Sequence, residues 1–450
     1  MWLTGPNVAH PREVSHIERT EQPWGPGGRD SVAGACSPAP ASYNAGGGTE
    51  ATAGPMASSR PEYDVVVVGG GPSGAAVGTL LARSGRSVLI ADKARFPRDK
   101  PCGGGITGRC ARTLGEIFGQ DTLGQVTRAA SSGFRMFYQG RFLAGVDDGV
   151  RMLFVKRREM DAVLLRKAKD AGCEVLEGAE ATGVEPSQSA VSFRSGQVVR
   201  GAIIVGADGA RSIVGRSVRP RQGGTGKGTG FGLVAEVPAA ELRDTASQLP
   251  QIHFGLVPWG YGWVFPNGDT VSIGVGGLLG TRTDFRQLLK HLVEATCRPG
   301  TWDTLHPRGH PLPLGHPERN PGHGHVLLLG DAAGLVESVT GEGISFALES
   351  AQLAASAVLR ALSGGTPSAA GRAYKAAYRR TLWPHLRNAS LARWLFFPRL
   401  CLPLAMRSLR RHPKVVEWYL EILAGKMSYP AFFRRLAVEL LRRPAAKPRE

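Results

Sequence analysis

The chain has 450 residues, of which 42% are hydrophobic and 20% charged, and it carries a net charge of +18. This composition is typical of a globular protein with a sizeable core and excludes a wholly disordered or fibrous chain. The excess charge is C-terminal, since residues 366–450 hold 18 Lys and Arg against 4 Glu, a net of +14. A nucleic-acid-binding surface would spread this charge, so we expect no nucleic-acid partner.

The six cysteines form no CxxC pair, and the histidines between His306 and His325 are separated by Pro and Gly. Neither set has the spacing of metal ligands, so we expect no metal site. No apolar run reaches the roughly 18 residues that a transmembrane helix needs. Without a recognisable secretory signal, the thiols are expected to be reduced and the protein cytoplasmic.

Residues 1–60 are rich in Gly, Ala, Pro and Ser and show no apolar periodicity. This pattern predicts a disordered N-terminal extension, because such a segment buries too little apolar surface to offset the entropy of ordering.

A βαβ unit follows. The run "DVVVVGG" is a short, β-branched strand that we expect to be buried on both faces, and "SVLIAD" is a second one. Between them, Gly69, Gly71 and Gly74 form a GxGxxG motif at the start of a helical stretch. Such a turn lets a pyrophosphate approach the helix N-terminus, while Asp92, next to Lys93 at the end of the second strand, is placed to bind a ribose hydroxyl.

Two further motifs follow apolar strands: "VGADGARS", with Asp208 and Gly209, and "VLLLGDAAG", with Gly330 and Asp331. Between them, residues 228–277 alternate as antiparallel strands, and "NGD" at 267–269 is a hairpin turn. A long helix is expected after "TGEGI" at residues 340–344, and the C-terminal part is helical, basic and aromatic.

The three glycine-containing motifs together resemble the signatures of flavoprotein hydroxylases and their relatives, which bind FAD. Two further stretches, "FPRDKPCGGGI" (96–106) and "GYGWVFP" (260–266), look like motifs of the geranylgeranyl reductase family, flavoproteins that saturate double bonds in isoprenoid chains. The chain departs from the family at "LVESVTGEGI", where Glu337 and Ser338 replace the more usual Asn-Pro or Asp-Pro.

The motifs predict an α/β fold: a Rossmann-type FAD-binding domain with a parallel sheet, an inserted antiparallel-sheet substrate domain and a C-terminal helical region. We expect a discontinuous FAD-binding domain over residues 61–112, 150–215 and 322–365. The substrate domain would cover 113–149 and 216–321, and the basic helical region 366–450.

The resemblance also implies roles for single residues. Asp331 would hold the ribityl chain, and the helix beginning near Gly341, Gly343 and Ile344 would point its positive end at the pyrimidine edge of the flavin. Arg157 matches a family Arg near the cofactor, although Arg158 is an equal candidate by spacing.

Close to the reaction itself, Gly103, Gly104 and Gly105 would let the backbone lie against the isoalloxazine ring, with Cys102 between flavin and substrate. Tyr261 and Trp263 would line the substrate cavity; as alternating residues they share one face of a strand. Ordinary core packing is the alternative explanation for both aromatics.

The resemblance implies an FAD-dependent oxidoreductase that saturates isolated double bonds of a polyisoprenoid, by hydride from reduced flavin and a proton from Cys102, Tyr261 or a bound water. Candidate substrates are a menaquinone side chain, a geranylgeranyl lipid or diphosphate, or the geranylgeranyl group of a chlorophyll. The electron donor would be NADPH or a reduced ferredoxin-like protein. Alternatives are a monooxygenase or halogenase of the same superfamily and a non-catalytic prenyl-binding escort protein.

The C-terminal region mixes aromatics with Arg clusters, as in "RWLFFPRLCLPLAMRSLRR". This pattern is typical of helices that lie in a membrane interface, so we expect peripheral attachment to an anionic membrane surface. A helical cap with a solvated basic face is the alternative.

Overall fold

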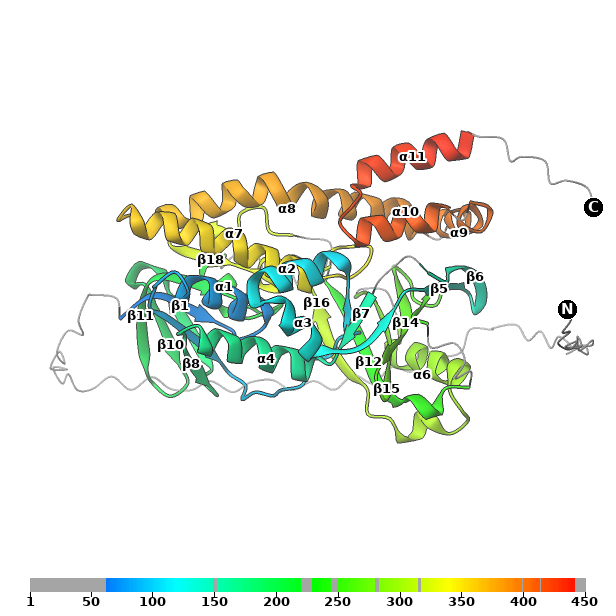
Figure 1. Ribbon diagram of the computed structural model, residues 1–450, viewed down its shortest axis with the longest axis horizontal. Helices are drawn as coiled ribbons and strands as arrows, with labels where there is room; N and C mark the ends of the chain where they lie inside the picture. The colour runs from blue at the N-terminus through cyan, green and yellow to red at the C-terminus, as the bar shows by residue number, and fades with distance from the viewer. Residues whose placement is uncertain are drawn as a thin grey trace, which may run out of the picture. The chain divides into compact units, whose positions relative to one another are not determined.

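The computed structural model describes residues 62–148, 152–219, 229–243, 249–279, 283–314, 317–398, 400–412 and 414–441. The extension expected over residues 1–60 lies outside these ranges. The described residues form three sheets and their covering helices (Figure 1).

The parallel sheet contains the strands predicted around the glycine motifs. In spatial order they are β17 (Gly322–His323), β18 (Val326–Leu328), β11 (Val198–Gly206), β1 (Tyr63–Val68), β2 (Val88–Asp92) and β8 (Glu174–Glu177). All neighbours from β18 to β8 pair in parallel, and the hairpin of β9 (Ala181–Glu185) and β10 (Ala190–Phe193) adds antiparallel pairs to β11. The valines of β1 are buried because helices and loops cover both faces of the sheet.

Helices from distant parts of the chain pack on this sheet. They are α1 (Pro72–Ala82), α2 (Gly108–Phe118), α3 (Gln120–Val126), α4 (Arg157–Asp170), α5 (Ile213–Val218) and α7 (Ile344–Ser363). Helix α1 contacts both α4 and α7, and one apolar core joins these helices, except α5, to β1, β2 and β11. The N-termini of α1 and α7 therefore belong to the same layer.

The second sheet is almost entirely antiparallel. Its order is β16 (Arg308–Leu312), β12 (Gly230–Pro238), β15 (Thr270–Leu278), β14 (Gly260–Asn267), β13 (Gln251–Phe254), β5 (Phe134–Tyr138) and β6 (Arg141–Val146), with only β5 and β13 parallel among these. The predicted turn joins β14 to β15 through Gly268, whose φ is +77°. Helix α6 (Phe285–Thr296) covers one face.

A third, small sheet is formed by β3 (Gly105–Ile106), β7 (Met152–Val155) and β4 (Thr127–Ser131). Short 3-10 turns lie at Pro186–Gln188, Ala239–Glu241, Thr301–Thr304 and Gly330–Ala333. The α/β fold with an inserted antiparallel sheet and a helical C-terminal region is thus confirmed, whereas the predicted domain limits stay a prediction.

The C-terminal helices begin on the parallel sheet, along which most of α8 lies, and continue over the other face of the second sheet. They are α8 (Ala369–Phe396), α9 (Cys401–Arg411), α10 (Lys414–Leu423) and α11 (Tyr429–Leu441). Helix α8 lies along α7, while α9 and α10 pack near β6 (Figure 1). Their apolar side chains share a core with those of β5, β13 and β14. None of the helices in the described ranges is long and apolar enough to cross a lipid bilayer.

Helix α8 is fixed to the parallel sheet at a close backbone contact. The Gly371 N–H donates to the Gly324 carbonyl at 2.7 Å, and a Cβ on Gly371 would lie 2.5 Å from the same oxygen. We therefore expect Gly371→Ala to lower the free energy of unfolding by about 1–3 kcal/mol, because the added methyl group overpacks this contact.

Urea denaturation would measure this change. Gly124→Ala is the matched control, since Gly124 also lies in a helix but has nothing within 4 Å of its Cβ position. The control should be neutral or more stable by up to about 1 kcal/mol. Equal effects of the two substitutions would contradict the proposed contact.

Candidate functional site

The GxGxxG turn between β1 and α1 leaves no space for side chains at two of its glycines. Gly69 has a φ of +106°, and a Cβ there would lie 2.3 Å from the Ala207 carbonyl oxygen. A Cβ on Gly74 would lie 1.8 Å from the Gly69 carbonyl oxygen. These glycines bring the turn against the loop after β11.

Gly71 has a different role, because the space around it is open. It precedes the first residue of α1, and no side chain caps this helix. The atom nearest to its Cβ position is Arg98 Nη2, at 3.7 Å. Unpaired N–H groups at a helix N-terminus next to a guanidinium group form a site for an anion, and they fit the pyrophosphate of a dinucleotide. The sequence motifs did not indicate Arg98.

Asp92 lies at the end of β2, as predicted, and its carboxylate accepts a hydrogen bond from the glycine turn. Oδ2 accepts the Gly70 N–H at 2.7 Å and Oδ1 the Ala94 N–H at 2.8 Å. Its ribose contact stays a prediction, as does a cofactor role for Lys93, whose side chain is exposed.

Asp208 accepts hydrogen bonds at the N-terminus of α5 (Ile213–Val218), whose N-cap residue is Ser212. Its carboxylate accepts the Ser212 hydroxyl at 2.5 Å and the Ile213 N–H at 2.6 Å, at the start of α5. Burial raises the pKa of Asp208 despite these hydrogen bonds. With Gly209 at a φ of +77°, this motif shapes the loop on which Gly69 packs.

The third motif lies between the two helix N-termini. A Cβ on Gly330 would lie 3.2 Å from the Ser73 hydroxyl of α1 and 3.1 Å from the Ala347 methyl of α7. Asp331 Oδ1 is 3.4 Å from the Cβ position of Gly343, the residue before Ile344 at the start of α7. Within the described ranges, the Asp331 side chain has no hydrogen-bond partner, so its oxygens are available to a ligand.

The loop before α7 is closed by hydrogen bonds of its own. The Glu337 N–H donates to the Glu342 carbonyl and the Gly341 N–H to the Glu337 carbonyl, both at 2.9 Å. Gly341 has a φ of +70°. Glu337, where the chain departs from the family pattern, is buried inside this loop.

Of the two candidate arginines, Arg157 is the buried one, and its contact with the cofactor stays a prediction. Its guanidinium group donates twice to Asp161, at 2.7 Å each, and Arg98 lies 3.2 Å from the same carboxylate. Burial opposes the charge of Arg157, but Asp161 and the Cys102 sulfur outweigh it and raise the pKa of Arg157. Arg158 instead points outward and lies 3.5 Å from Asp99.

The three glycines after Cys102 pack closely on other parts of the protein. A Cβ on Gly103 would lie 3.0 Å from the Trp263 indole nitrogen and 3.1 Å from the Phe265 ring. Gly104 has a φ of +76°, and a Cβ there would lie 2.3 Å from the Val155 carbonyl oxygen. Gly105 starts β3, which pairs with β7. Contact with a flavin ring stays a prediction for the opposite side of this segment.

Tyr261 and Trp263 lie on the face of β14 that points toward the C-terminal helices, with ring centroids 6.2 Å apart. The Tyr261 hydroxyl donates to the Thr340 carbonyl in the loop before α7. Burial raises the pKa of Tyr261 well above its usual value. The Trp263 ring lies over Gly274, whose Cβ would be 2.1 Å from it.

A contact between Lys100 and His310 at the border of the two large sheets was not anticipated from the sequence. The Lys100 ammonium group contacts His310 Nε2 on β16. Burial lowers the pKa of Lys100 to about 8, although the charge of Asp331 opposes the shift. Burial and the charge of Lys100 lower the pKa of His310 to about 4, so the imidazole is neutral at pH 7.

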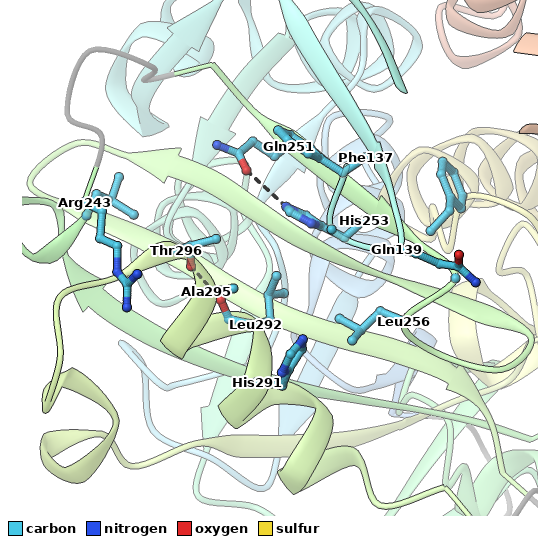
Figure 2. A pocket seen from close by; sticks show the side chains of 14 residues that line it. Phe137, Gln139, Arg243, Gln251, His253, Leu256, His291, Leu292, Ala295 and Thr296 are labelled. Atoms are coloured by element: carbon cyan, nitrogen blue, oxygen red, sulfur yellow. Dashed lines mark hydrogen bonds between the residues drawn. The ribbon is translucent and has the colours of Figure 1, made fainter. Parts of the chain in front are cut away.

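A hollow of about 490 Å³ lies elsewhere (Figure 2). It lies between α6 and the strands β5 and β13. His253 stacks on Phe137 there, with ring centroids 4.7 Å apart, and contacts Gln251 at 3.0 Å. None of the predicted site residues lines this hollow.

Fold and site together define an FAD-dependent oxidoreductase. An FAD binding domain model matches residues 62–260. Menaquinone reductase from Mycolicibacterium smegmatis is 34% identical over 373 residues, which cover 77% of this chain and 88% of that protein. Geranylgeranyl diphosphate reductase from Rhodobacter capsulatus is 31% identical over 317 residues, which cover 68% of this chain and 78% of that protein.

The chain therefore belongs to the geranylgeranyl reductase family. Among solved structures, a geranylgeranyl bacteriochlorophyll reductase-like protein from Thermoplasma acidophilum shares the fold at a TM-score of 0.66 and 19% identity, covering 84% of this chain and 98% of that one. A flavin-dependent brominase has a similar fold at a TM-score of 0.63 and 20% identity, and the match covers 84% of this chain and 98% of that one.

The buried Asp161 generates a prediction about stability. Asp161→Ala leaves the Arg157 guanidinium group buried without its partner, so we expect the free energy of unfolding to fall by about 3–5 kcal/mol. Chemical denaturation would measure it. The exposed Glu180, paired with Arg194 at 2.6 Å, is the control, and Glu180→Ala should not change stability measurably. A small effect of Asp161→Ala would contradict a buried, paired Arg157.

Proposed function

We propose that this protein saturates isolated carbon–carbon double bonds of a polyisoprenoid chain. The relatives named as menaquinone and geranylgeranyl diphosphate reductases support a substrate of this class. The observation that carries the proposal is the position of Cys102. Its segment lies between Arg157, on the FAD side, and the Trp263–Phe265 wall, on the side of the second sheet.

The residues present fit FAD. The N-terminus of α1 and Arg98 would hold the pyrophosphate, Asp331 the ribityl chain, and the N-terminus of α7 the pyrimidine edge. In its reduced form FAD supplies the hydride. Its two electrons come from a donor outside the chain, NADPH or a ferredoxin-like protein.

Cys102 is the proton donor in this proposal. An isolated alkene is not electrophilic, so one carbon must take a proton as the other takes the hydride. The Cys102 sulfur accepts the Gly104 N–H at 3.4 Å, and Arg157 is close enough for its charge to interact with the sulfur. Both groups are placed to stabilise negative charge on the sulfur after the proton leaves. The Tyr261 proton, by contrast, is engaged with the Thr340 carbonyl.

The aromatic wall keeps water from the reacting carbons and contacts the isoprenoid chain. Tyr261, Trp263 and Phe265 pack side by side in the apolar core that β14 shares with the C-terminal helices. Water there would quench the cation-like carbon formed by protonation.

The end of α8 and helix α9 form the proposed contact with an anionic membrane surface. Large apolar side chains are exposed there: Leu391, Trp394, Leu395, Leu400 and Leu404. Exposed basic residues flank them, among them Arg387, Arg407 and Arg410. This combination of an apolar cluster with surrounding cations is what an interfacial helix presents to anionic lipid.

The function can be tested by mass spectrometry of the isoprenoid lipids of a bacterial host that expresses the full chain. We expect products heavier by one H₂ for each saturated double bond. Cys102→Ala should lower their formation by about a hundredfold or more, the typical contribution of a general acid. Cys401→Ala is the control, because Cys401 is a half-buried free thiol on α9 and should leave the products unchanged.

Products that contain oxygen from labelled O₂ would instead establish a monooxygenase, whose fold is shared by the flavin-dependent brominase described above. Undiminished saturation by Cys102→Ala would remove the cysteine from the proton transfer and leave the reductase activity in place.

The membrane contact has its own test, cosedimentation with vesicles of mixed neutral and anionic lipid. Leu395 and Leu400 are 61% and 84% exposed, and each replacement by Ser should weaken binding about tenfold, because burying a leucine contributes about 1.5–3 kcal/mol. Val198→Ser, at a 45% exposed valine on β11, should have no effect. Equal binding by all three variants would exclude this surface.

A further inference from the structure

The loop between the Gly330–Ala333 turn and α7 is organised around the Glu337 carboxylate. Oε2 accepts the Val339 N–H at 3.0 Å and both the N–H and the hydroxyl of Thr340 at 2.5 Å. Glu337 is only 2% exposed. The conformation of residues 337–343 therefore depends on a buried acceptor that takes three hydrogen bonds from the loop.

The fourth partner of this carboxylate comes from the C-terminal end of the chain. Tyr429, the first residue of α11, donates its hydroxyl to Glu337 Oε1 at 2.6 Å. The Tyr429 ring lies 5.4 Å from that of His385 on α8, centroid to centroid. Burial lowers the pKa of His385 to about 4, which makes it neutral. Within the described ranges, this is the hydrogen bond that joins α11 to the loop before α7.

Burial raises the pKa of Glu337, and the hydrogen bonds from Thr340 and Tyr429 oppose this shift. Other groups close enough to act on its charge come from every neighbouring element. They are Arg109 of α2, Arg393 of α8, Glu342 of the loop, Tyr261 of β14 and Tyr419 of α10. Arg109 is already paired with Glu349 at 2.5 Å. The hydrogen bonds to its own oxygens are therefore the interactions that most directly oppose the effect of burial on Glu337.

We propose that Glu337 and Tyr429 are a positioning pair through which helix α11 sets the loop before α7, and with it the flavin-facing end of that helix. The inference rests on the flavin placement proposed above. Thr340 links the two sides, because it donates to Glu337 and its carbonyl accepts the Tyr261 hydroxyl. A change at Glu337 is thereby transmitted to the aromatic wall as well as to the first turn of α7.

Tyr429→Phe tests the pair and keeps the ring. The buried Oε1 loses its donor, so the pKa of Glu337 rises further, and protonation weakens the hydrogen bonds of Oε2 to the loop as the pH falls. We expect the ratio of the FAD dissociation constant of this variant to that of wild type to grow by about tenfold as the pH is lowered, the effect of one hydrogen bond to a charged group. Fluorescence titration of the purified full-length proteins with FAD, repeated over a range of pH, would measure it.

Glu337→Gln is the second variant, because a glutamine does not ionise in this range. The Tyr429→Phe/Glu337→Gln double variant should lose the pH-dependent component, which isolates the pairwise coupling. Tyr378→Phe is the matched control. Tyr378 is a fully buried tyrosine on α8 whose hydroxyl has no partner within the described ranges, and its removal should leave FAD binding unchanged.

Three results would overturn the proposal. The first is an FAD affinity of Tyr429→Phe equal to that of wild type. The second is an FAD affinity of this variant that is weaker than that of wild type by the same factor at every pH. The third is an FAD affinity of the double variant that still depends on pH as that of Tyr429→Phe does. A wild-type protein that binds no FAD would instead refute the flavin placement itself, so the two failures are distinguishable.

Discussion

Three loops meet at the carboxyl end of the parallel sheet, and at Gly69 and Gly74 the main chains approach so closely that a methyl group would not fit between them. The turn after β1 touches the loop after β11 through Gly69, and Gly74 brings α1 onto that turn. Gly330 adds the loop after β18, against Ser73 and Ala347. The N-termini of α1 and α7 are held in one place by these contacts. Because an anionic, elongated cofactor needs both positive helix ends at a fixed separation, the rest of the site depends on this packing.

Buried charges fix the border between this sheet and the second one. Asp161 of α4 receives both Arg157 and Arg98, and Lys100 from the segment after β2 contacts His310 on β16. A charge removed from water is tolerated only when it is paired, so Asp161 fixes the orientation of both arginines as well as their position. The contact with the neutral His310 imidazole holds the end of the Lys100 side chain at the second sheet. Cys102, two residues after Lys100, is presented to the aromatic wall by a segment fixed from both sides.

The glycine motifs predicted the parallel sheet and the FAD class. Each motif contains, in its own short stretch of sequence, both the strand and the glycines that its function requires. The pattern of β14 likewise predicted which aromatics share a face. Arg98, His310 and Tyr429 were out of reach of this reasoning. Their partners lie far away along the chain: Lys100 and His310 are separated by 210 residues, and Glu337 and Tyr429 by 92. Spacing alone also left Arg157 and Arg158 equal, and only packing on Asp161 distinguished them.

Helix α9 is apolar on two sides, and this explains what the C-terminal segment does for the site. Leu402, Met406 and Leu409 face the core shared with the second sheet, while Leu400 and Leu404 are exposed. A helix that only covered the core would present polar residues outward. The outer leucines thus suit the proposed contact with lipid, where a polyisoprenoid resides. The same segment continues through α10 to Tyr429, which donates to Glu337. One stretch of chain therefore connects the proposed lipid surface to the loop before α7 by a single hydrogen bond onto a buried charge.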